Sequence, residues 1–211
     1  MVKLNMMKLN ILQVFNPNRW KAFRKYTEGL KWTMRGRTVD ACDAFRQAVS
    51  LHTNNPVYRA MLGIAYADLQ NYQFAIRELL LSIEYGIMGN RLASEAYGFL
   101  GLSYLQTKNY NEAIRSFEKS LELFRDSTSR IKKGTLYQNL AGLYRRQGQF
   151  DKSISMYKNA LEERPNDAEL CILLGLSYLE CGQNEAGNKA VKKGLELDPS
   201  LANKYPSIKD V

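Results

Sequence analysis

Small and aromatic residues alternate along the chain in a pattern that recurs every 34 to 40 residues. Five small residues begin the units of this pattern: Gly29, Gly63, Gly101, Ala141 and Gly175. An aromatic residue follows each of them three places later: Trp32, Tyr66, Tyr104, Tyr144 and Tyr178. The spacings between the small residues are 34, 38, 40 and 34. A period near 34 residues is typical of helical repeat arrays, so the pattern predicts paired helices along most of the chain.

The same register continues into a second predicted helix of each unit. Small residues stand twelve places after the first one: Ala41, Ala75, Ala113, Ser153 and Gly187. Bulky residues stand sixteen places after it: Phe45, Leu79, Phe117, Tyr157 and Val191. Small residues return at nineteen places: Ala48, Ser82, Ser120, Ala160 and Gly194. Small side chains let two helices approach closely, and the bulky ones fill the space between units. Pro165 and Pro199 then end the second helix of the last two units, because proline has no N–H to continue the helix.

This arrangement resembles the tetratricopeptide repeat (TPR) family. The fourth unit carries the resemblance most fully: Tyr137, Leu140, Ala141, Tyr144, Gly148, Phe150, Tyr157, Ala160 and Pro165. The first unit is the least typical, since Glu28 precedes its glycine. The resemblance implies an all-α fold, a right-handed α-solenoid of stacked antiparallel helix pairs. It implies five repeats within residues 22–201, at 22–55, 56–93, 94–133, 134–167 and 168–201. A basic amphipathic N-terminal segment (1–21) and a C-terminal tail (202–211) flank them.

Two junctions between repeats are longer than the standard period. The spacings of 38 and 40 place extra residues within 86–91 and 125–130. Longer helices or wider loops are the simplest explanation. The alternative is a change in superhelix curvature, which would reshape any surface that the repeats form together.

The positive charge is concentrated at the N-terminal end. The formal net charge is +9, and residues 1–37 hold Glu28 as their single acidic residue against nine basic ones: Lys3, Lys8, Arg19, Lys21, Arg24, Lys25, Lys31, Arg35 and Arg37. Such a basic end attracts anionic protein, lipid headgroups or nucleic acid. The three cysteines, Cys42, Cys171 and Cys181, show neither a disulfide framework nor metal spacing, so we expect a reducing compartment and a cytoplasmic protein.

The N-terminal segment has a moderately amphipathic pattern. On a helical wheel one apolar arc holds Leu4, Met7, Ile11, Val14 and Phe15. Residues 16–18, Asn-Pro-Asn, are expected to stop this helix before the array. Three roles stay open for the segment: a cap over the first repeat, a contact with a partner or a second copy, and a helix on a lipid surface. At the other end, the tail is too short for a full capping helix, so an open apolar flank would favour self-association.

In TPR proteins the first helices of successive repeats line a concave groove that binds partners. Transferring that register implies a mostly apolar wall: Tyr26, Leu30, Met34, Met61, Ile64, Phe99, Leu102, Leu105, Leu173, Leu176 and Leu179. The fourth repeat instead implies a polar, basic stripe: Gln138, Asn139, Arg145 and Arg146. Such a groove suits a peptide with apolar anchors and a carboxylate. The alternative is that the apolar residues are buried within the array or beneath residues 1–21.

The sequence offers no candidate catalytic, metal or cofactor site. His52 is the only histidine, and no Cys/His cluster has zinc spacing. Some TPR proteins clamp the carboxylate of a chaperone tail with Lys, Asn and Arg residues. None of the three runs of three consecutive repeats holds this set; the first run has Tyr26, Leu30, Met61, Glu95 and Phe99 at the matching positions. We therefore expect neither an enzyme nor a co-chaperone of that kind, and no cofactor.

The leading hypothesis is a non-catalytic scaffold or adaptor that binds a protein or peptide segment in the groove, with homo-oligomers as an open option. The alternative is a membrane-peripheral assembly factor that docks on anionic lipid through residues 1–25. Nucleic-acid binding through the basic end (Lys21, Arg24, Lys25 and Lys31) ranks lower. Aromatic residues do alternate with these cations, but Tyr26 and Trp32 already belong to the repeat pattern.

Overall fold

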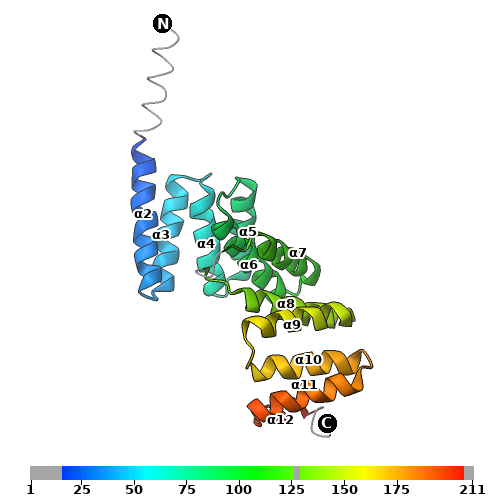
Figure 1. Cartoon of the computed structure of the whole chain (residues 1–211). Coiled ribbons are helices and arrows are strands. Elements are labelled where there is room, and N and C mark those ends of the chain that lie inside the picture. Colours follow the sequence, from blue (N-terminus) through cyan, green and yellow to red (C-terminus); the bar gives the residue numbers. More distant parts are fainter. Residues whose placement is uncertain (1–15, 126–128, 207–211) are drawn as a thin grey trace. The chain divides into compact units, whose positions relative to one another are not determined.

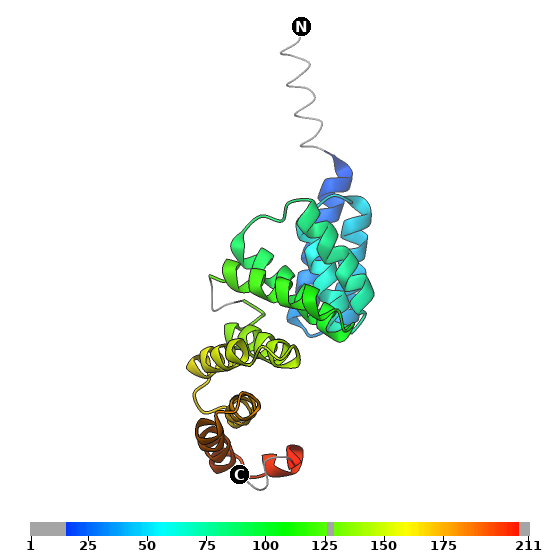
Figure 2. The same cartoon turned by 90° about the vertical axis from the view of Figure 1, so that its right-hand side faces the viewer.

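The computed structural model describes residues 16–125 and 129–206, and no strand occurs in these two ranges. Figures 1 and 2 show the resulting helices in two views. Their bounds are α2 (Pro17–Met34), α3 (Thr38–Leu51), α4 (Pro56–Asp68), α5 (Tyr72–Glu84), α6 (Asn90–Gln106), α7 (Tyr110–Leu123), α8 (Lys133–Arg146), α9 (Phe150–Glu163), α10 (Ala168–Glu180), α11 (Asn184–Leu197) and α12 (Leu201–Lys204). The amphipathic pattern predicted for residues 3–15 lies outside the described residues.

Consecutive helices fold into hairpins that pack side by side. The closest pairs are α2 with α3, α4 with α5, α8 with α9 and α10 with α11. The chain forms two compact units, Met1–Asn109 and Tyr110–Val211, which are described separately below as the N-terminal and C-terminal units. Within the units α4 also packs on α3, and α10 packs on α9. The prediction of an all-α fold built from stacked antiparallel helix pairs is confirmed, whereas the predicted repeat boundaries stay predictions.

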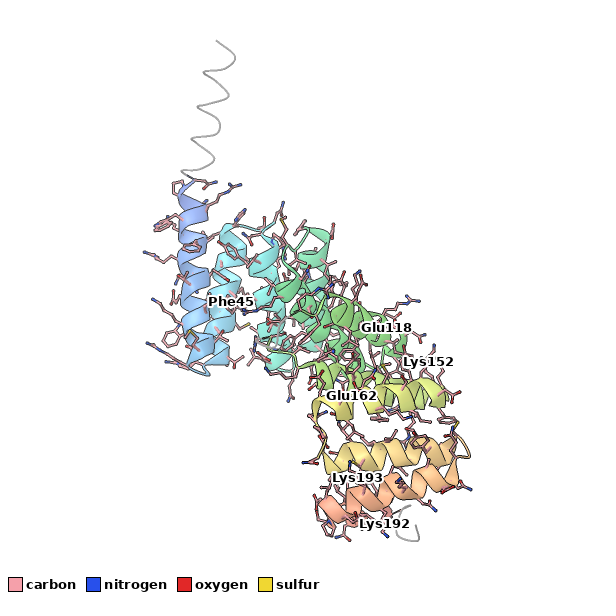
Figure 3. All side chains as sticks on the ribbon, in the orientation of Figure 1. Phe45, Glu118, Lys152, Glu162, Lys192 and Lys193 are labelled. Atoms are coloured by element: carbon pink, nitrogen blue, oxygen red, sulfur yellow. The ribbon has the colours of Figure 1, made fainter. Side chains whose placement is uncertain are left out.

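Glycine and bulky side chains meet where the two helices of a pair cross. A Cβ atom placed on Gly29 would lie 2.5 Å from Cε1 of Phe45, and one on Gly63 would lie 2.7 Å from Cγ of Leu79. Figure 3 labels Phe45 on α3. In the last pair, a Cβ on Gly175 would lie 2.6 Å from Cγ2 of Val191. At these three crossings glycine is a steric requirement, because a Cβ atom there would occupy the space of the buried partner.

Serine takes the small position in some repeats, and its hydroxyl finds a partner there. Ser82 is fully buried and donates to the carbonyl oxygen of Pro56 at 2.7 Å. The hydroxyl oxygens of Ser153 and Ser177 lie 3.1 Å apart between α9 and α10. These contacts let a polar side chain occupy a close helix crossing without an unpaired hydroxyl.

One residue in each hairpin turn has a left-handed backbone. Gly36, Gly148 and Gly182 have φ angles of 70°, 71° and 78°. The equivalent positions of the second and third repeats hold Gln70 at 61° and Lys108 at 63°. Glycine adopts this conformation without the steric penalty that a Cβ atom brings, so two of the turns carry a residue that fits less well.

Side-chain caps fix where several helices begin. Asn16 accepts a hydrogen bond from the N–H of Asn18 at 2.9 Å, and Pro17 follows it at the start of α2. Asn55 caps α4, and Asp167 caps α10 by accepting from the N–H of Leu170 at 3.0 Å. Residues 16–18 thus begin α2, and the first helix of the array includes residues that the sequence assigned to the N-terminal segment. Proline in the first helical position explains this, since its missing N–H has no partner there in any case.

The first long junction and the C-terminal end differ from the standard repeat in identifiable ways. Helix α6 has 17 residues, whereas α4 and α10 have 13 each. The extra residues at 86–91 thus precede and extend into a longer first helix, which agrees with the simpler explanation that helices are longer at this junction. At the C-terminal end, Leu201 of the short helix α12 and Tyr205, which follows the helix, lie against the buried residues Ile172 and Val191. The predicted open flank is therefore partly covered.

Candidate functional site

An open hollow lies on the face of the C-terminal unit formed by the first helices α8 and α10. Its volume is about 450 Å³, and its lining residues are Gly142, Arg145, Arg146, Phe150 and Glu180. Gly142 leaves the space over α8 open, since a Cβ atom there would meet only the hydroxyl oxygen of Tyr157, at 3.7 Å. The spacing of Asn139, Gly142 and Arg146 places all three on one face of α8.

Arg145 is fixed by a carboxylate of the facing helix. Its Nε donates to Oε2 of Glu180 at 2.8 Å, and its Nη2 donates to Oε1 of the same residue at 3.0 Å. The hydrogen bonds to Glu180 raise the pKa of Arg145, and burial raises the pKa of the neighbouring Tyr157 hydroxyl. The guanidinium is therefore already neutralised within the unit. The repeat register predicts Arg145 and Arg146 together as cations of one stripe, whereas the structure gives them different surroundings.

Arg146 is the exposed cation of the hollow. Its guanidinium carbon lies 4.8 Å from the centre of the Tyr110 ring, a distance typical of a cation–π contact. Among residues 16–125 and 129–206, none of the carboxylates forms an ion pair with Arg146. The hollow thus presents one neutralised arginine and one arginine held only by an aromatic ring.

The two polar residues that precede these arginines also differ. Gln138 accepts a hydrogen bond from Nη2 of Arg164 at 2.7 Å, so its amide oxygen links α8 to the end of α9. The side chain of Asn139 is half-buried and makes no hydrogen bond within the described ranges. Of this pair, Asn139 shares the face of α8 with Gly142, although it does not line the hollow itself.

The leucines predicted for the same face mostly pack inward. Leu173 contacts the buried cluster around Ile154 and Tyr157. Leu176 and Leu179 contact the cluster of Ile172 and Val191. All three are half-buried, and they support α10 from its inner side. The apolar wall predicted for the last repeat is therefore partly buried against the core, and its part in a groove stays a prediction.

Sequence reasoning missed Phe150 and Glu180. Glu180 lies five places after Gly175, and Arg146 lies five places after Ala141. Glu180 and Arg146 therefore occupy the same position in successive repeats. Had this position been included in the predicted groove, Glu180 would have been predicted beside the arginines. Phe150 lies just beyond the turn of the fourth repeat, where the sequence assigned it only to the repeat pattern.

Comparison with known families decides the identity of the array. A tetratricopeptide repeat family model matches residues 92–166, and a second one matches residues 144–203. Together these matches span more than half of the 211-residue chain. The chain belongs to the tetratricopeptide repeat family. None of the curated proteins matches this TPR chain.

Solved structures show the same TPR fold over most of the chain. A crystal structure of MamA has a TM-score of 0.70 and 22% identity, covering 87% of this chain and 94% of its own. The crystal structure of YrrB, described as a TPR protein with an unusual peptide-binding site, has a TM-score of 0.72 and 14% identity, covering 90% and 92%. A second MamA structure has a TM-score of 0.72 and 23% identity, covering 84% and 99%. At these identities the likeness shows the solenoid fold.

The N-terminal TPR unit buries much of its predicted groove wall. Ile64 has no exposed surface, and Met61 and Phe99 are also buried. Leu30, Leu102 and Leu105 are half-buried, and Tyr26 lies with its ring centre 5.1 Å from that of Tyr58. Met34 alone among these residues is widely exposed, at 88%. A single groove through both units stays a prediction, since the predicted residues belong to separate units.

The basic end of this TPR chain lies on α2. Lys21, Arg24 and Lys31 are exposed, whereas Lys25 donates to Glu28 at 2.9 Å and is partly buried. The hydrogen bond from Lys25 lowers the pKa of Glu28. None of the helices in the described part of the chain is long and apolar enough to span a bilayer.

Proposed function

We propose that this TPR chain is a scaffold that holds a segment of another polypeptide on the α8–α10 face of its C-terminal unit. The hollow over Gly142 carries the proposal, because it is open, polar and lined from both facing helices. It coincides with the polar part of the groove that the family register implies. Of the whole predicted groove, the binding site is thus limited to the accessible part within the C-terminal unit.

The charge of the hollow favours a segment with an acidic side chain. Arg146 has its guanidinium exposed beside the ring of Tyr110, where a carboxylate can receive two N–H donors. Arg145 is a poor competitor for that carboxylate, since Glu180 already occupies two of its donors. The ion pair of Arg145 and Glu180 instead joins α8 to α10 at the hollow. Its solvent-facing atoms can form hydrogen bonds with the backbone of the ligand.

Two further residues give the segment an orientation. The amide of Asn139 lies on the same face of α8 as Gly142 and can pair with a peptide group of an extended ligand. The ring of Phe150 supplies an apolar side wall next to the charged residues. A short motif with an acidic residue beside an apolar one fits this combination. YrrB, a protein of the same fold, is described as having a peptide-binding site, which agrees with such a use of the fold.

The test is to fill the hollow with a larger side chain and to measure which peptides no longer bind. Peptides selected from a random display library on the full chain are measured against Gly142→Leu and Gly142→Ala. The alanine variant is the matched control, because its Cβ makes only an ordinary contact with Tyr157. We expect Gly142→Leu to abolish binding, Gly142→Ala to retain most of it, and both proteins to keep their helical circular dichroism.

A charge substitution tests the ligand chemistry separately. Arg146→Gln is expected to lower the binding affinity for acidic peptides by about tenfold or more, since a hydrogen bond to a charged group contributes about 1.5–3 kcal/mol. Replacing the acidic residue of the peptide by its amide should give the same loss. Selected peptides that bind Gly142→Leu as tightly as the unchanged protein would show that the hollow is not the binding site.

A further inference from the structure

Helix α2 exposes two aromatic side chains on the same face as two cations. Trp20 is 69% exposed and Phe23 is 46% exposed. Their ring centres lie 5.9 Å apart with an angle of 28° between the planes. Arg24 and Lys31 are also exposed, and their spacing from Trp20 places them on the same side of the helix. We name these four residues, Trp20, Phe23, Arg24 and Lys31, the outer stripe of α2.

The electrostatic surroundings of the outer stripe are strongly basic. Arg19 and Lys21 are exposed at the beginning of the same helix. Glu28 is the only acidic residue of the α2 sequence, and Lys25 already pairs with it at 2.9 Å. A single exposed ring is common on a protein surface, but two adjacent exposed rings rimmed by cations are typical of an interaction site.

We propose that the outer stripe docks on a bilayer surface that contains anionic lipids. Trp and Phe side chains partition into the boundary between headgroups and acyl chains, where a ring is shielded from water. Basic residues near that surface are attracted by the negative headgroups. Trp20 and Phe23 enter the interface in this arrangement, while Arg24 and Lys31, which follow them along the same side of α2, meet the lipid phosphates. The docking uses only the N-terminal unit, so it is independent of the peptide site in the C-terminal unit.

Other occupants fit the outer stripe less well. Nucleic acid needs several free aromatic faces for base stacking, but Tyr26 packs on Tyr58, and the guanidinium of Arg37 lies 4.5 Å from the centre of the Trp32 ring. A second copy that docked symmetrically, stripe against stripe, would bring the same positive charge against it. Residues 1–15 contain Lys3 and Lys8 and no acidic residue, so they offer this basic helix no complementary charge. A negatively charged lipid surface satisfies the cations and the aromatic pair together.

The two tryptophans of the chain allow a direct test. Trp32→Phe in the full chain leaves Trp20 as the only tryptophan. Vesicles of equal parts phosphatidylcholine and phosphatidylglycerol are expected to shift its emission to the blue and to protect it from acrylamide. Added salt should reverse the change, and pure phosphatidylcholine should produce none. Trp20→Phe, with Trp32 as the only tryptophan, is the matched control and should show no shift.

Vesicle sedimentation then tests the individual residues. Arg24→Gln and Lys31→Gln should each lower the partition coefficient about fivefold, the effect expected for one basic residue near an anionic surface. Phe23→Ser should also lower it, whereas Phe74→Ser, which changes an exposed ring on α5, should not. Circular dichroism checks that every variant is folded. Unchanged partitioning of the three stripe variants, or a Trp20 signal that responds to oligonucleotide and not to vesicles, would overturn the proposal.

Discussion

The left-handed residue of the hairpin turns shows how much one backbone position contributes. Three turns hold glycine, and two hold Gln70 and Lys108 at φ angles of 61° and 63°. A residue with a Cβ atom is disfavoured in this conformation by roughly 1–2 kcal/mol. The unfolded chain gains entropy when glycine is introduced, and this gain offsets part of the benefit.

We predict that Gln70→Gly and Lys108→Gly each stabilise the chain by up to about 1 kcal/mol. The measurement is the urea midpoint at constant slope. Gly148→Ala is the converse control and should lower the midpoint, because its φ of 71° is unfavourable for alanine. A lower midpoint for Gln70→Gly would mean that its side chain makes a contact that outweighs the backbone strain.

At the same scale, the repeat register predicted the buried residues well. Phe45, Leu79, Phe117, Tyr157 and Val191 are all buried, as expected. Phe45, Leu79 and Val191 pack on the glycine of their own helix pair, whereas the pattern was expected to place the bulky residues between units. The polar contacts were less predictable. The pair of Arg145 with Glu180 joins residues from different repeats, and the charge alone did not reveal that one arginine was already neutralised.

Helix α12 is the element that sequence reasoning did not anticipate. Four residues are too few to give a helical pattern of their own. Its position depends on Glu169 of α10, which accepts hydrogen bonds from Nζ of Lys204 and from the hydroxyl of Tyr205, both at 2.6 Å. These bonds, with Lys204 contributing most, lower the pKa of Glu169.

This arrangement makes the docking of α12 sensitive to acid. A carboxyl group whose pKa is lowered by folding contributes stability above its unfolded pKa and loses it as the pH falls through the folded value. We therefore predict lower protection factors for amide exchange in α12 below about pH 4, with no such change near neutral pH. Glu169→Gln should show the lower protection factors already at neutral pH. Glu196→Gln, an exposed carboxylate on α11, is the control and should leave α12 unchanged.

For the whole molecule, the repeat architecture predicts that a destabilising substitution loosens mainly the helices next to it. Repeats of this kind contact mainly their neighbours, so stability is close to a sum over repeats and their interfaces. Leu79 is fully buried on α5 against Gly63, and we predict that Leu79→Ala costs about 2–5 kcal/mol. Hydrogen exchange should become faster in α4 to α6 and stay unchanged in α10 and α11. The adjacent Leu80, 44% exposed, provides the control substitution to alanine. An equal increase in α10 and α11 would show that the two units unfold as one.

The fold and family of the whole molecule were predictable from the sequence because five registers repeat the same steric requirement. The binding surface was harder to predict from the sequence, for a physical reason. The family register indicates which side of a helix faces the groove, but burial depends on the helix packed over that side. Ile64 and Met61 fit the groove register and are buried.

The distribution of cysteines makes the C-terminal unit easy to monitor. Cys42 and Cys171 are buried, and burial raises the pKa of both thiols, so each resists alkylation at neutral pH. Cys181 is partly accessible and follows Glu180 directly at the end of α10. A maleimide dye would therefore attach mainly at the end of α10, one residue after Glu180 of the hollow, without any engineered residue. Its fluorescence would change when a ligand displaces the solvent there, so the natural chain already contains the attachment point for its own binding sensor.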